Sequence, residues 1–248
     1  MGLCKLCNKE KKLIKAHIIP EWVTKFIKDE DTRPIKVLST KEGTYPRKSY
    51  TGEYDENILC ASCDEKIGQW DDYAKTFFLS DIDKSTIRKF KGEDIGYEIK
   101  DFEYEKAKMF CMSLLWRQSV STRDIFQGVN LGNNYEEHLR RILIGEVSAK
   151  DSDFPVVLMR FNYDPKKISM LHPYKVRLNN VLFYKMSILG FRIFVKVSKV
   201  DTPSALHSFV LKDNNPLYVI LDEYVGSKEH NVMGKIVNYN IKKHGRIF

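Results

Sequence analysis

Residues 4–20 read CKLCNKEKKLIKAHIIP, and residues 56–68 read ENILCASCDEKIG. Each stretch contains a Cys-x-x-Cys pair, and two such pairs separated by a long insert are typical of zinc ligands. Four thiolates complete the tetrahedral coordination shell of a structural Zn²⁺. We therefore predict that Cys4, Cys7, Cys60 and Cys63 hold one structural zinc ion. This ion would join the start of the chain to the beginning of a helix at Cys63.

The composition is that of an ordinary globular protein. The chain has 248 residues, 43% of them hydrophobic and 30% charged, which suffices for one large domain or two smaller ones. No apolar run approaches the ~18–20 residues of a membrane span, and the first residues lack the pattern of a signal peptide. We expect a cytoplasmic protein with no membrane partner, and in that compartment reduced thiols favour metal binding over disulfides.

The net charge of +8 is unevenly distributed. Residues 1–100 carry 19 basic and 18 acidic side chains, whereas residues 101–248 carry 22 and 15. The last part of the chain has Lys235, Lys242, Lys243 and Arg246 with no acid between them. A basic surface of this kind attracts nucleic-acid phosphates, but a merely solvated basic face is an equal alternative at this charge.

The pattern along the chain predicts an α+β fold. An N-terminal zinc-stapled module, residues 1–85, would be followed by a helical middle and a β-rich C-terminal part, which together form a second module at residues 86–248. Apolar spacing and turn residues predict helices at 21–28, from 63 to about 79, 103–120 and 134–145. They predict strands at 13–19, 155–161, 180–200, 216–225 and 234–242.

The order of motifs in residues 1–80 resembles the zinc-stabilised branch of the HNH endonucleases, which have the ββα-metal (His-Me finger) fold. The matching elements are Cys-x-x-Cys, then His-Ile-Ile-Pro, then Asn-Ile-Leu-Cys-x-x-Cys-Asp. The resemblance implies that His17 is the general base, that Asn57 orients it, and that Asp64 helps to hold a catalytic divalent ion. The chain departs from the family at two positions, with Ala16 where many members have Asp, and Asp64 where Asn or His is common.

The implied roles agree with the chemistry of phosphodiester hydrolysis. A His accepts a proton from water near neutral pH, and a carboxylate suits Mg²⁺ or Mn²⁺. Asp71 and Asp72, further along the same predicted helix, are expected on a solvated face. The basic and aromatic residues of the insert would suit backbone phosphates, or form an ordinary exposed hairpin; they are Lys41, Tyr45, Arg47, Lys48 and Tyr50.

The prediction is therefore a metal-dependent HNH-type endonuclease that acts on nucleic acid, with DNA as the expected substrate. The bacterial subgroup that the chain resembles suggests an antiviral defence or mobile-element context. The C-terminal module would serve target recognition, dimerisation or a protein partner. Two alternatives stay open: a non-catalytic zinc module that binds nucleic acid, in which Ala16 marks a lost metal site, and a zinc-stabilised protein–protein adaptor.

Overall fold

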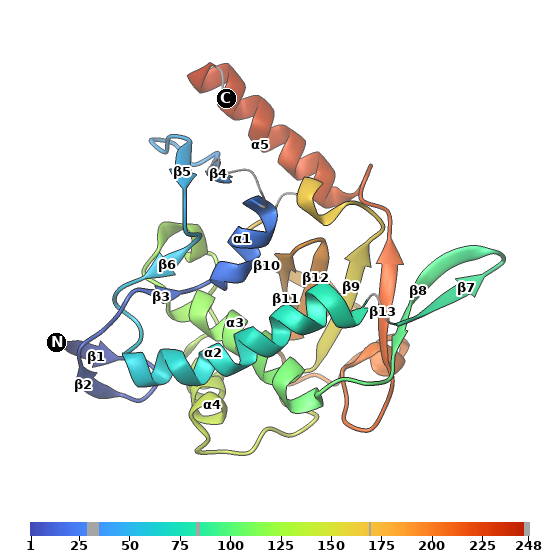
Figure 1. The fold of residues 1–248 in the computed structure, drawn as a ribbon, viewed down its shortest axis with the longest axis horizontal. Coiled ribbons are helices and arrows are strands. Elements are labelled where there is room, and N and C mark those ends of the chain that lie inside the picture. The colour runs from blue at the N-terminus through green and yellow to red at the C-terminus, as the bar shows by residue number, and fades with distance from the viewer. Residues whose placement is uncertain (29–34, 83–84, 169, 246–248) are drawn as a thin grey trace.

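The computed structural model describes residues 1–28, 35–82, 85–168 and 170–245. It confirms an α+β fold, in which a small N-terminal unit and a helical middle precede a seven-stranded sheet. The ribbon in Figure 1 shows the two long helices α2 and α3 lying side by side in front of this sheet, and the contacts between them agree. The four cysteines lie together at the N-terminal end.

The N-terminal unit consists of two small β-pairs and a helix. β1 (Gly2–Cys4) pairs with β2 (Lys9–Lys11), β3 (Ala16–His17) pairs with β6 (Tyr54–Asp55), and α2 spans Ala61–Thr76 before one π-helical turn at Phe77–Asp81. The predicted strand at 13–19 was too long. The chain there changes partners, because Ile14 bonds to the carbonyl of Leu59 and Ile18 to that of Glu53, so that only two residues remain as a strand.

The insert between β3 and β6 carries one helix and one hairpin. α1 (Glu21–Lys28) has the predicted bounds and buries Trp22 and Val23. β4 (Ile35–Val37) and β5 (Arg47–Ser49) form an antiparallel pair. The insert thereby projects from the β3–β6 pair as a separate arm.

Two helices form the middle of the chain. α3 (Tyr104–Val120) is buried along nearly its whole length, including Cys111 and Trp116. α4 (Asn133–Ile144) begins one residue before the predicted cap, behind Gly132, and ends at Gly145. Gly145 has a φ of 89°, a left-handed conformation that glycine adopts at no steric cost. Short 3₁₀ turns lie at Asp124–Phe126, Pro165–Lys167 and Ser204–Phe209.

The sheet has the strand order β10-β11-β12-β9-β13-β8-β7, and only the β13–β9 pair is parallel. The predicted strands match β9 (Val156–Phe161), β11 (Val181–Ile188), β12 (Phe191–Lys196) and β13 (Leu217–Asp222). Three strands were not predicted: β7 (Thr86–Phe90), β8 (Glu93–Ile99) and β10 (Tyr174–Leu178). They lie toward the two edges of the sheet, where polar and charged residues replace the continuous apolar runs that mark the central strands.

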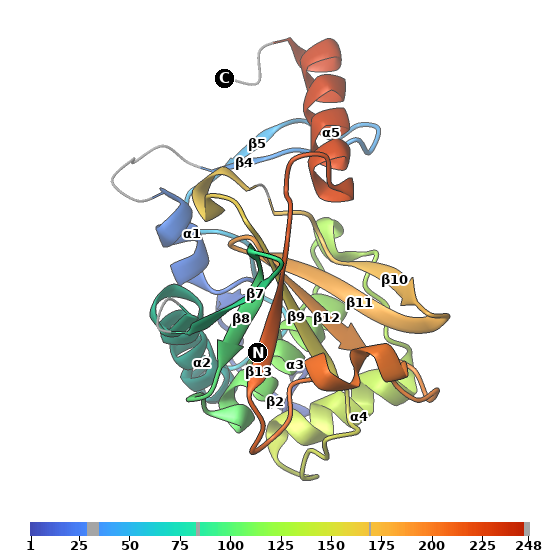
Figure 2. The same cartoon turned by 90° about the vertical axis from the view of Figure 1, so that its right-hand side faces the viewer.

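The predicted strand at 234–242 was wrong. These residues belong to α5 (Lys228–His244), a helix that rises from the body and is visible in both ribbon views (Figure 1 and Figure 2). Ser227 caps its start by accepting a hydrogen bond from the His230 amide, which satisfies one of the free amides of the first turn. The residues between Gly234 and Lys242 include the β-branched Ile and Val that led to the strand prediction, but they continue the helix that Ser227 caps.

One continuous apolar core extends from Cys4 to Val219 and joins the N-terminal unit, α3 and the sheet. Phe78, which follows α2, packs edge-on against Phe191 of β12 with ring centroids 4.7 Å apart. The predicted division near residue 85 therefore falls inside a shared core. In the four described ranges, no helix is both long and apolar enough to cross a membrane.

Candidate functional site

The four cysteines of the two Cys-x-x-Cys pairs form a cluster. Their sulfur atoms all lie within 4.8 Å of one another, and the Cys60 amide donates to the Cys4 sulfur over 3.4 Å. Cys4 ends β1 and Cys60 caps the start of α2. Within the described residues this is the only group of three or more His, Cys, Asp or Glu side chains placed to hold a metal ion. The predicted metal-binding role of these residues is thus supported by their positions.

The surroundings of Cys60 favour the thiolate form of its side chain. Burial opposes its ionisation, but hydrogen bonds from the Ser62 hydroxyl and the Cys63 amide outweigh burial and lower the pKa of Cys60 to about 6. The start of a helix favours a negative charge in the same way. A thiolate is the form that binds a metal, so the protein prepares this ligand at neutral pH.

His17 lies at the end of β3, half-buried, opposite Tyr54 of β6. Its Nε2 atom lies 3.1 Å from the carbonyl oxygen of Thr51. Because a carbonyl oxygen only accepts hydrogen bonds, Nε2 carries the hydrogen, and the neutral ring keeps Nδ1 as its proton acceptor. The Tyr54 ring meets the His17 ring edge-on, with centroids 6.4 Å apart. The ring is therefore held in one tautomer with one nitrogen ready to accept a proton.

Asp64 lies in the first turn of α2 and is half-buried. Its carboxylate has neither a hydrogen bond nor an ion pair with any residue that the structure describes. Burial raises the pKa of Asp64 above its ordinary value, while the charges of Arg117 and His17 act in the opposite direction. The Asp64 carboxylate is thus half-buried and has no partner among the described residues.

Asp71 is not on a solvated face, contrary to the prediction. It lies seven residues after Asp64, two turns along the same side of α2, and its side chain is 15% exposed. Both of its oxygens accept hydrogen bonds from Arg117 of α3, at 2.8 and 2.7 Å. The prediction failed because the partner comes from another helix, 46 residues further along the chain.

Arg117 is the residue of the site that sequence reasoning missed. Its side chain is 1% exposed, and Nη1 also donates to the backbone carbonyl of His17 over 3.0 Å. It therefore links the His17 backbone to Asp71. A usable signal was present, since an arginine within an apolar helix requires a buried partner.

Asn57 does not contact His17 within the described part of the chain. Its side-chain amide donates to Asp55 at 3.3 Å and to Thr122 at 3.5 Å. Because Asp55 lies opposite Ala16 in the β3–β6 pair, any influence of Asn57 on His17 passes through this strand pair. Its predicted orienting role stays a prediction.

Asp55 ties the strand pair to the end of α3. It is almost completely buried and accepts hydrogen bonds from the Thr122 amide and hydroxyl, at 2.6 and 2.9 Å, and from the Ser121 hydroxyl at 3.0 Å. Burial alone would raise the pKa of Asp55, but these bonds and one from the Asn57 amide hold it below its ordinary value.

We expect Asp55→Ala to lower the free energy of unfolding at pH 7 by about 2–4 kcal/mol, because several buried donors lose a charged acceptor. The lowered pKa means that this stabilisation is present above the unfolded pKa of ~3.9 and is lost as pH falls through the folded pKa. Urea unfolding from pH 7 to pH 3 should show the difference from wild type narrowing below about pH 4. Asp124→Ala, an exposed carboxylate, is the control, and an equal loss there would contradict the assignment.

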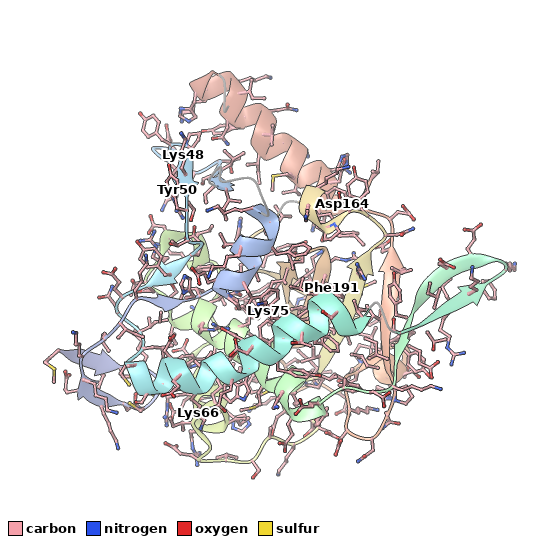
Figure 3. The ribbon with its side chains drawn as sticks, viewed as in Figure 1. Lys48, Tyr50, Lys66, Lys75, Asp164 and Phe191 are labelled. Carbon is pink, nitrogen blue, oxygen red and sulfur yellow. The ribbon has the colours of Figure 1, made fainter. Side chains whose placement is uncertain are left out.

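A cleft of about 770 Å³ opens beside the strand pair. Its walls come from the segment joining β4 to β5, the end of β6, the loop after α3, and α5; they include Lys41, Arg47, Tyr54, Asn57, Arg123 and Ile236. Tyr54 and Asn57 place one end of the cleft next to the strand that pairs with His17. Figure 3 shows Lys48 and Tyr50 along β5, below α5. The basic and aromatic residues of the insert are thus exposed or line this cleft, as a phosphate-binding role requires.

Comparison with known proteins finds no match to a family model, to a curated protein or to a solved structure. The functional argument therefore depends on the residues and geometry of this chain.

Proposed function

We propose that the protein is a metal-dependent HNH-type endonuclease that hydrolyses phosphodiester bonds of DNA. One observation supports the proposal: Arg117 donates both to the His17 carbonyl and to Asp71, which lies two turns from Asp64 on the same side of α2. His17 and the Asp64 carboxylate, which has no partner among the described residues, thus belong to one connected group of side chains. A positioned proton acceptor beside a cation-binding oxygen is the arrangement that metal-assisted hydrolysis uses.

We assign the metal of the cysteine cluster as structural zinc. Four sulfur donors and no carboxylate suit Zn²⁺, whereas Mg²⁺ and Ca²⁺ prefer oxygen. A shell filled by four protein ligands leaves no position for water or substrate. The role of this ion is therefore to hold β1, the following turn and the start of α2 together, and so to place Asp64 relative to His17.

Each residue of the site would have a separate role in hydrolysis. Nδ1 of His17 takes the proton from the attacking water, and the Thr51 carbonyl stabilises the protonated ring through Nε2–H. Asp64 would hold Mg²⁺ or Mn²⁺ together with phosphate oxygens and water, and the ion would offset the charge that develops on the phosphate. Arg117 is buried and paired, so its role is to position His17 rather than to contact the substrate.

Cleavage of supercoiled plasmid, with Mg²⁺ or Mn²⁺ and without an added divalent ion, tests this proposal. We expect metal-dependent nicking by wild type and a loss of at least ~100-fold in Asp64→Asn, because the cation loses its charged ligand. Asp72→Asn removes another carboxylate of the same helix, which is exposed. This variant should cleave the plasmid like wild type. Absence of cleavage by wild type with every divalent ion would contradict the proposal.

One observation favours the second candidate, a zinc-stabilised module that binds DNA without cutting it. Asp71 is engaged by Arg117, and the fully buried Ala16 stands where a further ligand would be, so Asp64 is the one free carboxylate of the constellation. Plasmid binding that depends on the basic surface, without cleavage, would support this alternative.

A further inference from the structure

We propose that the exposed face of α5 is a binding surface for duplex DNA, which holds the substrate while its strand enters the cleft. The inference deepens the proposed function and rests on it only in taking DNA as the substrate. Neither the motif in residues 1–80 nor the cysteine cluster involves this helix.

The exposed face of α5 carries a regular row of lysines. Lys228, Lys235 and Lys242 are exposed and lie seven residues apart, which places them on one side of the helix at intervals of ~10.5 Å. Exposed Gly234 and Asn238 lie between them. None of the three lysines is ion-paired with a carboxylate of the described residues. The row therefore keeps its positive charge.

The acidic residue of α5 is buried and does not lie on this face. Glu229 is 4% exposed and forms an ion pair with Lys185 of β11, while Tyr174 donates a hydrogen bond to it over 3.2 Å. Burying the carboxylate against the sheet leaves Lys, Asn, Gly and one exposed Ile on the outer side. The outer side of α5 therefore carries lysines and no carboxylate of the helix itself, although Lys228 at its start shares a surface hollow with Asp222 and Glu223.

The opposite face of α5 is anchored, so the row has a fixed position. Asn240 is fully buried and donates to the Ser39 carbonyl over 3.0 Å. The His244 ring contacts the Tyr45 ring with centroids 5.0 Å apart, and Ile236 forms part of the cleft wall. Both ribbon views show the β4–β5 hairpin beside the helix (Figure 1 and Figure 2).

The row of lysines on α5 lies next to the hairpin and the cleft that lead toward His17. Lys48 on β5 and Tyr50 directly after it are exposed next to α5 (Figure 3). The cleft extends from Ile236 of α5 to Tyr54, which pairs with His17. DNA bound along α5 and the hairpin would thus have one strand directed toward the proposed base.

The geometry points to duplex DNA as the occupant. A helix about 10–12 Å wide fits the B-form major groove, which is about 12 Å wide, whereas the major groove of duplex RNA is too narrow for it. Three unpaired lysines would contact the phosphates at the groove edges, and Gly234 lets the helix backbone approach closely. An acidic protein offers the same charge but no such groove, and the experiment below separates the two.

The test compares the triple variant Lys228→Gln/Lys235→Gln/Lys242→Gln with a matched control, Lys91→Gln/Lys150→Gln/Lys199→Gln, which removes three exposed charges elsewhere. Fluorescence anisotropy with a ~20-bp DNA duplex, without added divalent ion, gives the affinity as a function of salt. Each phosphate contact contributes ~0.9 to the slope of log K against log salt. Relative to wild type, we expect the magnitude of this slope to fall by about 2–3 in the α5 variant and by less than ~0.5 in the control variant. The melting temperatures of both variants should be unchanged.

Three outcomes would overturn the inference. The first is the same slope of log K against log salt for the α5 variant and the control variant. The second is a loss of affinity of the α5 variant for single-stranded DNA or duplex RNA that equals its loss for duplex DNA, and the third is no affinity of wild type for any nucleic acid. Plasmid cleavage separates this test from that of the nuclease. If wild type cleaves the plasmid but the α5 variant binds DNA like wild type, only the inference about α5 is contradicted. If the α5 variant loses DNA affinity but wild type does not cleave, only the proposed nuclease activity is contradicted.

Discussion

Replacement of Cys60 by serine is expected to release the metal and unfold the N-terminal unit. The wild-type protein should contain about one zinc ion per chain, and the variant should contain almost none. Binding at a four-cysteine site contributes ~10–16 kcal/mol to folding, which equals or exceeds the whole stability of a typical domain, ~5–15 kcal/mol. The strands of the unit contribute few backbone hydrogen bonds of their own, because β3 and β6 have two residues each and β1 and β2 have three.

Elemental analysis and circular dichroism measure this effect, and limited proteolysis locates it. The matched control is Cys111→Ala, which removes a buried thiol from α3 and should keep the zinc at a cost of about 1 kcal/mol for the lost packing. A Cys60→Ser protein that stays folded without metal would show that the cluster is not a structural zinc site.

The second large effect is expected from His17→Ala. Plasmid cleavage should fall by roughly 10²–10⁴-fold, the usual contribution of a positioned general base. Zinc content should not change, because His17 is not among the sulfur ligands, and the melting temperature should fall by only a few degrees with the loss of one hydrogen bond. DNA affinity should also be retained, since the proposed phosphate contacts lie on α5 and the hairpin.

His207→Ala provides a control of matched chemistry. Its Nε2 lies 2.7 Å from the Thr202 carbonyl, so the variant removes a histidine with the same kind of hydrogen bond, in an exposed turn outside the site. It should cleave at the wild-type rate. Equal activity of His17→Ala and wild type would exclude His17 as the base, even if the protein is a nuclease.

Features whose determinants lie close together in the sequence could be predicted. The two Cys-x-x-Cys spacings led to the cluster of four sulfurs, and the apolar periodicity led to α1, α3 and α4 within one or two residues. The central strands β9, β11, β12 and β13 were recognisable because burial on both faces demands continuous apolar runs.

Features set by distant partners could not be predicted. The pairing of Asp71 with Arg117 joins two helices whose approach depends on the whole core. The Ile and Val residues of α5 suggested a strand, whereas the segment forms a helix capped by Ser227 and anchored by contacts with Lys185, Ser39 and Tyr45. The orienting role of Asn57 stays a prediction, and its contact with Thr122, 65 residues further along the chain, could not be read from the sequence.

The hydrogen bonds of Arg117 have a consequence for how such a protein can evolve or be engineered. A segment ending near residue 85 would carry the motif into a gene fusion but leave Asp71 as a buried, unpaired carboxylate and the His17 carbonyl without its donor. Breaking a buried ion pair in this way costs about 3–5 kcal/mol. Recombination should therefore keep residues 1–122 together, so that Arg117 and Thr122 stay with their partners, and should keep the sheet that covers α3 as well. The segment proposed to be catalytic would then be inherited together with α3, and not as a cassette cut at the end of its motif.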